Sequence, residues 1–420
     1  MSATTATSPA TLPRARAWAL ALTATLTMSV SYVDRQALAA IAPSVQEALG
    51  ISDADYGSLI SAFALAYLVG APLAGRLIDH VGARRGLLGA VLLWSGVAAL
   101  HALVPSFAVL FALRILLGLT EAPSFPAAAQ TVHRALPPRD RARGLGVLFT
   151  GSSIGAMIAP PLATFLASRF GFRAAFLGTA VVGLSWVPLW LIMAYEPRAR
   201  RVLDQPHAAP RVEEGPPVSA LALLRNPAVL RAVLAVIASA PFINLMFSWG
   251  TKYLVHDFHM TQKETGGYLW FPPLVFDAGS IAFGHFASRA RSRGSDGVPR
   301  GLFAFAGSLM LAGLAMPLAN DPLLSLGCAS VALAGGGGVY AMATSDMLSR
   351  VSPRLLSTAG GITAAAQSIA QIIVNPIIGR SVQASSSYTP MILVLSAWVV
   401  PGVVAWVAWR PPPLYPDDDD

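Results

Sequence analysis

The chain has 420 residues, of which 55% are hydrophobic and only 12% are charged. Because charged residues make up about 25% of an average soluble protein, this composition cannot cover a water-facing surface and excludes an ordinary soluble globular protein. The net charge of +8 does not indicate a nucleic-acid partner, because the arginines lie in short loops between apolar runs. The single cysteine, Cys328, excludes a disulfide framework and a metal–thiolate site.

The N-terminal region combines a polar segment with a long apolar run. Residues 1–16 are predicted to form a disordered cytoplasmic tail, and the apolar run that follows continues past Tyr32. A cleavable signal peptide has a shorter apolar core and a small-residue cleavage site. We therefore predict an uncleaved first span.

Apolar runs long enough to cross a bilayer, which takes about 20 residues, recur along the chain. The loops on one side are rich in arginine, whereas the loops on the other side hold several acidic residues and few arginines. This asymmetry predicts that both termini are cytoplasmic in a multi-pass protein of the inner (plasma) membrane. The twelve predicted spans are residues 17–40, 56–78, 86–104, 107–131, 142–167, 173–194, 228–253, 265–288, 301–318, 322–346, 357–380 and 388–409.

The longest polar segment divides these spans into six and six. On either side of it, L-P-P-R-D-R-A-R-G-L-G (136–146) resembles V-S-P-R-L-L-S-T-A-G-G (351–361) at an offset of 215 residues. Repeated halves with a site between them are typical of secondary transporters. The predicted fold is an all-α membrane protein with twelve transmembrane helices in two pseudo-symmetric six-helix domains. Their predicted bounds are 17–194 and 227–410, with a cytoplasmic linker at 195–226 and an acidic tail at 411–420.

Two of the predicted spans carry charged residues. Span four contains Arg114 and Glu121, which seven-residue spacing places on one helix face about 10 Å apart, too far for a direct pair. Span one contains Asp34 and Arg35. A charge at the bilayer centre costs at least about 2.5–3.5 kcal/mol, so these residues are candidates for function. Together the four charges sum to zero, which makes their burial tolerable.

The loop between the second and third spans carries glycine, aspartate and arginine at fixed spacing, in G-R-L-I-D-H-V-G-A-R-R (75–85). It resembles the loop signature of the major facilitator superfamily, although His80 stands where Arg or Lys is usual and Ser288 replaces the acid in the second copy. The resemblance implies a gating role, because a loop carboxylate can cap a neighbouring helix and pair with a base in one conformation only. The matching residues are Gly75, Asp79, Gly82, Arg84 and Arg85.

Within that superfamily the chain resembles the anion:cation symporters, such as bacterial hexuronate, galactonate and glucarate permeases and the vesicular glutamate and sialin carriers. Three passages carry this resemblance: Y-V-D-R (32–35), R-I-L-L-G-L-T-E-A-P-S-F-P (114–126) and F-D-A-G-S-I-A-F-G (276–284). The span-five segment G-S-S-I-G-A-M-I-A-P-P-L (151–162) lacks the Gly-Pro pairing of drug exporters, which favours symport.

The resemblance also implies roles for individual residues. Arg35 and Arg114 are expected to receive a substrate carboxylate, for which a guanidinium is well suited. Asp34 and Glu121 are expected to be the protonation sites. Tyr32 and Tyr67 would line the pocket, and Asn375 and Gln371 would face it from the second half. Weaker candidates for contacts to substrate hydroxyls are Asn244, Trp249 and Gln367.

Structural interpretations remain open for the same residues. Asp34 with Arg35 would then be an interface pair at a span end, and Arg114 with Glu121 a static lock between helices. Asn375 before Pro376 would satisfy backbone groups at a kink. Asp277 is interpreted as a packing or gating residue, Lys252 as a side chain that reaches the interface, and the run 335–338 of four glycines as close packing or a hinge.

These observations predict a proton-coupled symporter of an organic anion, with a sugar acid such as a hexuronate or aldonate as the leading substrate. Binding of anion and proton would reinforce each other, because each restores neutrality that the other disturbs. The alternatives are other mono- or dicarboxylates, an exporter or facilitator of a neutral or cationic compound, a membrane-embedded enzyme, and a transporter-like receptor. We expect a monomer in the lipid bilayer that uses protons as coupling ions, with no other cofactor, metal or nucleic acid.

Overall fold

The computed structural model describes residues 12–204, 220–352, 355–409, 411 and 413–414, and the regular elements in these ranges are helices. The helices up to residue 204 are α1 (Arg14–Ala40), α2 (Ala42–Leu49), α3 (Asp53–Val81), α4 (Ala83–Leu100), η1 (His101–Leu103), α5 (Phe107–Glu121), α6 (Ser124–Ala135), α7 (Pro138–Phe170), α8 (Phe172–Ala194) and α9 (Pro197–Leu203). Those after residue 219 are α10 (Ala220–Leu224), α11 (Pro227–Asp257), α12 (Gln262–Gly266), α13 (Phe271–Arg291), α14 (Arg300–Met310), η2 (Leu311–Leu318), α15 (Pro322–Leu348), α16 (Leu356–Ser385), α17 (Thr389–Ala397) and α18 (Val399–Ala408).

Ten helical segments of the described chain are long and apolar enough to cross a membrane. This confirms the all-α membrane fold. The count of twelve stays a prediction, because α1 and α13, which coincide with the first and eighth predicted spans, are not among the ten. α1 is long enough, but Asp34, Arg35 and its five threonines and serines make it more polar than the others.

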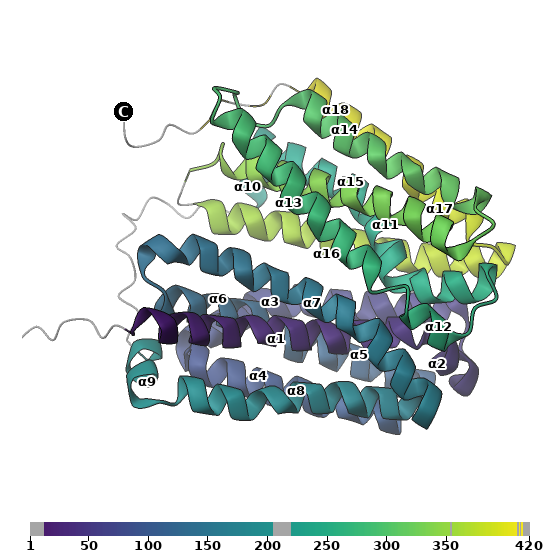
Figure 1. Cartoon of the computed structure of the whole chain (residues 1–420), viewed down its shortest axis with the longest axis horizontal. Helices are drawn as coiled ribbons and strands as arrows, with labels where there is room; N and C mark the ends of the chain where they lie inside the picture. The colour runs from purple at the N-terminus through teal and green to yellow at the C-terminus, as the bar shows by residue number, and fades with distance from the viewer. Residues whose placement is uncertain (1–11, 205–219, 353–354, 410, 412, 415–420) are drawn as a thin grey trace, which may run out of the picture.

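The helices gather in two groups that follow the order of the chain (Figure 1). Helices α1–α9 form one group, here called the first half, and α10–α18 form the second half. They touch where α3 packs on α16, α1 on α11, and α7 on α12 and α13. The domain bounds stay predictions. α1 begins at Arg14, inside the predicted tail 1–16, and the predicted linker 195–226 contains α9 and α10; residues 1–11, 205–219 and 415–420 lie outside the described residues.

The fourth predicted span, 107–131, corresponds to one apolar segment, Phe107–Ala135, in which the helix is locally interrupted. α5 ends at Glu121, and α6 begins at Ser124 and runs to Ala135. Pro123 lies in the break, and a proline inside a helix removes a backbone donor and clashes with the preceding turn. The break leaves Glu121 at a helix end inside the protein, where it is fully buried.

Glycines allow helices to approach closely in two places. Within the second half, a Cβ at Gly335 would meet the backbone of α14, and one at Gly337 would meet the backbone of α13, so the glycine run is a packing surface of α15. Between the halves, a Cβ at Gly57 of α3 would meet the Asn375 carbonyl, and one at Gly379 of α16 would meet the backbone of Asp53. α3 and α16 therefore touch backbone to backbone, and we call this contact the glycine seam.

Polar contacts join the two halves at the end remote from the chain termini, where α2, α12 and α17 lie (Figure 1). Tyr56 of α3 donates its hydroxyl to the carbonyl of Ser248 at 2.5 Å, and Asp53 forms an ion pair with Lys252 of α11. Ser44 of α2 contacts Gln262 of α12 at 2.9 Å. The protein is thus closed at this end, here called the far end. Lys252 is buried in this ion pair, which replaces the interpretation of a side chain that reaches the membrane surface.

A buried ionic cluster, which the sequence analysis missed, fixes the second half near the other end. The carboxylate of Asp346 on α15 accepts from Arg231 of α11 at 2.8 Å and from Arg350 at 3.1 Å, and it also accepts the backbone N–H of Val298 at 3.1 Å. Arg231 also donates to the carbonyl of Trp406 and stacks on its ring, 3.5 Å from the centroid. Both arginines converge on one acid, so its removal leaves two buried guanidinium groups without their common carboxylate.

We predict that Asp346→Asn lowers the stability of the purified protein by about 3–5 kcal/mol, because breaking a buried ion pair leaves an uncompensated charge. The measurement is unfolding in detergent by denaturant. Asp296→Asn is the matched control, since Asp296 also pairs with Arg350 but its side chain is 74% exposed, and exposed pairs contribute about 0–1 kcal/mol. Equal losses in the two variants would contradict the assigned role of Asp346.

Candidate functional site

A buried ion pair between α1 and α5 forms the centre of the candidate site. Arg35 donates to Oε2 of Glu121 at 3.1 Å through a terminal nitrogen and at 3.4 Å through Nε. Ser31, one turn earlier on α1, donates its hydroxyl to the same oxygen at 2.9 Å. The other oxygen, Oε1, is buried without a hydrogen-bond partner among the described residues. Glu121 is therefore well bound on one side and unsatisfied on the other.

Aromatic rings surround the guanidinium of Arg35. Its central carbon lies 4.6 Å from the ring centroid of Tyr32, 4.7 Å from that of Tyr67 and 4.9 Å from that of Phe63. These distances are within the range of cation–π attraction. The Arg35 side chain is 20% exposed whereas Glu121 is 0% exposed, so the arginine is the member of the pair that a ligand can reach.

Arg114 lies on the same helix as Glu121, two turns nearer the far end. It is 3% exposed, and its guanidinium lies 4.7 Å from the ring centroid of Phe63, so this one ring contacts both arginines. Among the described residues no ion pair joins Arg114 to an acid, and its Nε has no hydrogen-bond partner. A buried cation without a carboxylate partner is a receptor for an anion in chemical terms.

The side chain of Asp34 points in a different direction from that of its neighbour Arg35. It is 3% exposed and lies near Trp94 of α4 and Thr179 of α8, inside the first half. Neither carboxylate oxygen has a hydrogen-bond partner at ordinary geometry in the described chain. Consecutive residues of a helix point about 100° apart, which explains why Asp34 and Arg35 do not pair. An unpartnered buried carboxylate is suited to hold a proton.

The two predicted ligands from the second half, Asn375 and Gln371, have different surroundings. Asn375 is fully buried, and its amide oxygen accepts from Asn244 at 2.8 Å and from Trp249 at 2.9 Å. Its amide nitrogen donates to the backbone carbonyl of Gln371 at 2.8 Å. Asn375 is thus satisfied within the protein in this conformation, while the Gln371 side chain is partly exposed.

Tyr340 of α15 was missed by the sequence analysis. It lies near enough to Tyr32 of α1 to interact with it electrostatically, so a tyrosine of the second half lies in the neighbourhood of the site. The only signal in the sequence is a tyrosine inside an apolar run, which is also typical of packing.

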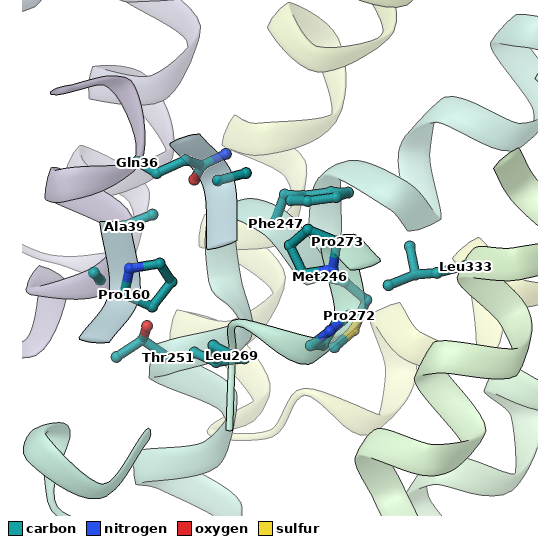
Figure 2. A pocket seen from close by; sticks show the side chains of 12 residues that line it. Gln36, Ala39, Pro160, Met246, Phe247, Thr251, Leu269, Pro272, Pro273 and Leu333 are labelled. Atoms are coloured by element: carbon teal, nitrogen blue, oxygen red, sulfur yellow. The ribbon is translucent and has the colours of Figure 1, made fainter. Parts of the chain in front are cut away.

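A small cavity lies between the two halves, between this site and the far end (Figure 2). Its volume is about 30 Å³. A sugar-sized ligand needs a pocket of some hundreds of Å³, so the far-end cavity does not admit such a ligand. The lining comes from α1, α7, α11, α13 and α15 and includes Gln36, Ala156, Pro160, Phe247, Thr251, Pro273 and Leu333.

The residues of the loop motif lie at the end opposite the far end. Gly82 has φ +84°, a conformation that favours glycine, and Asp79 accepts from Gln130 of α6 at 3.3 Å. Arg84 is buried and binds both carboxylate oxygens of Asp204, at 2.9 Å and 2.6 Å. These hydrogen bonds from Arg84 lower the pKa of Asp204 below its usual range. Arg85 is exposed.

Gly75 lies within α3, and a Cβ at this position would meet no atom within 4 Å. In the part of the chain that the structure describes, no group of three or more histidine, cysteine or acidic side chains is arranged to hold a metal ion.

Several curated proteins resemble this chain in sequence. The galacturonate transporter of Dickeya chrysanthemi is 28% identical over 277 residues, which are 64% of this chain and 80% of that protein. The D-galactonate transporter of Escherichia coli O6:H1 is 24% identical over 91% of this chain and 93% of its own length. A chloramphenicol resistance protein of Streptomyces lividans is 33% identical over 69% of this chain and 70% of its own length.

The fold also matches a solved structure, a bacterial homologue of the human lysosomal transporter Spinster in an inward-facing and unoccupied conformation. The TM-score is 0.80 at 16% identity, and the match covers 94% of this chain and 97% of the other. The model of the Major Facilitator Superfamily matches residues 24–375, which confirms the resemblance of the loop motif. The chain belongs to the Major Facilitator Superfamily and is a transporter rather than an enzyme.

Proposed function

We propose that this transporter is a proton-coupled symporter of an organic anion, with a sugar acid as the leading substrate class. The observation that carries the proposal is the pair of Arg35 and Glu121, in which the arginine is accessible and the carboxylate is not. The names of two relatives, a galacturonate and a D-galactonate transporter, support the substrate class.

The geometry supports a coupling mechanism based on competition for Arg35. A substrate carboxylate that binds the exposed guanidinium competes with Glu121 for the same donors. Loss of its counter-ion raises the proton affinity of a buried carboxylate. Since Asp34, Arg35, Arg114 and Glu121 sum to zero, an added anion makes the site negative and a proton restores neutrality. Anion and proton therefore bind cooperatively.

The closed far end suggests how the two halves would move. With the predicted cytoplasmic termini, closure by Asp53–Lys252 and Tyr56–Ser248 corresponds to an inward-facing state of an inner-membrane protein. Rocking of the first half against the second would break these contacts and bring the site to the other side. The residues of the loop motif would then take part in gating at the end where the termini lie.

A second candidate function is transport of a neutral compound out of the cell. It is favoured by the 33% identity to a chloramphenicol resistance protein. Such a transporter has no need of an anion receptor and would tolerate neutral replacements of Arg35 and Arg114. The two candidates therefore differ in what these arginines contribute to ligand binding.

We predict that Arg35→Gln weakens binding of galacturonate or D-galactonate by about 10- to 150-fold, the effect of one charge-assisted hydrogen bond. Arg35→Lys keeps the charge but loses the planar fork and recovers only part of the affinity. The measurement is calorimetric titration of the purified protein, with the exposed Arg201→Gln as a control. Wild-type protein that binds chloramphenicol and neither acid, with no effect of Arg35→Gln, would replace the anion proposal by the second candidate.

We predict that Glu121→Gln abolishes proton-driven accumulation of the sugar acid but retains exchange of labelled for unlabelled substrate. The amide cannot take up and release the coupling proton, while it leaves Arg35 accessible to the substrate. Both activities are measured in proteoliposomes, with an imposed pH gradient in one assay and equal pH in the other. If binding is also lost, Glu121 is a structural residue and the coupling proposal fails.

We predict that Asp53→Asn weakens closure of the far end, because it removes the ion pair with Lys252 between the halves. The probe is Ala39→Cys at the far-end cavity, in a Cys328→Ala background, labelled with a membrane-impermeant thiol reagent. Labelling should become several-fold faster in Asp53→Asn and stay unchanged in Asp55→Asn, whose carboxylate accepts hydrogen bonds from Ser52 of its own half. Equal labelling of all variants would show that the ion pair does not control closure.

A further inference from the structure

The second half places one acid within the site region, Asp277 of α13. It lies inside the predicted eighth span and is half-buried. Its neighbour across the boundary between the halves is Ser153 of α7. Among the described residues no basic side chain forms an ion pair with it. Because a carboxylate at membrane depth is costly, an unpaired one is by default a candidate for function.

The position of Asp277 follows from the residues that line the far-end cavity. Pro273 and Ala156 both line it, and Figure 2 shows Pro273 directed into it. Asp277 follows Pro273 by four residues, and Ser153 precedes Ala156 by three, so each shares a helix face with its cavity residue. Because α7 and α13 run in opposite directions, Asp277 and Ser153 both lie one helical turn from the cavity, on its side toward the chain termini.

The first half places Tyr32, in contact with the guanidinium of Arg35, at the same depth. Tyr32, which stacks on Arg35, precedes the cavity residue Gln36 by four residues and also lies one turn farther from the far end. At this depth the first half therefore presents Tyr32, which contacts Arg35, and the second half presents Asp277. An ionised carboxylate accepts hydrogen bonds but donates none.

We propose that Asp277 determines substrate specificity: it accepts hydrogen bonds from the hydroxylated end of a sugar acid whose carboxylate is bound at Arg35, and it disfavours a second carboxylate there. The inference rests on the proposed function and deepens it by naming hydroxylated monocarboxylates as the preferred class over dicarboxylates. Like charges facing each other in a binding site are an effective means of rejecting a wrong ligand.

The experiment compares galacturonate with galactarate, which has the same carbon skeleton and a second carboxylate, by calorimetric titration of the purified full-length protein. We expect wild type to prefer galacturonate by about 10-fold or more, because a like charge placed against the bound ligand weakens its binding. Asp277→Asn should reduce this preference at least about fivefold by strengthening galactarate binding. Asp277→Glu and Ser153→Ala should keep the preference, since both retain the charge.

A second measurement does not depend on folding of the variants. The monomethyl ester of galactarate carries one charge and should bind wild type at least about fivefold more tightly than galactarate itself. Wild type that binds galacturonate without preference over galactarate, or a preference unchanged by Asp277→Asn together with an ester that binds no better, overturns this inference alone. Wild type that binds none of the three acids overturns the proposed function as well, and the inference falls with it.

Discussion

The structure of the first half depends on how a carboxylate is kept inside a membrane protein. Glu121 is fully buried, and Arg35 and Ser31 direct three hydrogen bonds at one of its oxygens. The break at Pro123 ends α5 at this residue, and the aromatic rings around Arg35 hold its guanidinium against the pair. The remaining oxygen of Glu121 and Nε of the nearby Arg114 have no hydrogen-bond partner among the described residues, so two groups able to bind a ligand lie close together.

Other buried charges are distributed by depth. Asp53 and Lys252 close the far end between the halves, whereas Asp346 with its two arginines and Asp204 with Arg84 lie near the opposite end, each within one half. Pairs within a half keep that half rigid, because their separation would leave a charge uncompensated. The pairs between halves are the ones that a moving transporter has to exchange.

Hydropathy was sufficient to predict most helices, because a membrane helix is defined by a long apolar run. α3 and α15, for example, begin and end within three residues of the predicted spans. The break after Glu121 was missed, since the apolar pattern continues across it. The partners Asp204 and Asp346 could not be predicted either, because each meets an arginine more than one hundred residues away, at Arg84 and Arg231.

The charged residues of the candidate site could be predicted, because charged side chains are rare in membrane-spanning segments. Arg35, Arg114 and Glu121 are conspicuous as charges in apolar runs. In the structure both arginines contact one ring, Phe63, and Glu121 pairs with Arg35. Tyr340 and the satisfied state of Asn375 were not predictable, because tyrosine and asparagine are as common in packing as in binding. Which hydrogen bonds such residues make depends on the tertiary arrangement.

The glycine seam between α3 and α16 has a mechanical consequence. Gly57 and Gly379 let the two backbones touch, and next to them Ser61 of α3 donates its hydroxyl to the carbonyl of Ile372 of α16 at 2.9 Å. Helices whose side-chain ridges pack into each other's grooves must move those side chains out of the grooves before they can separate. At Gly57 and Gly379 the backbones need no such clearance, so this junction works there as a plain bearing: it holds the closed position through close contact, and the Ser61 hydrogen bond is the link that has to break when the halves swing apart.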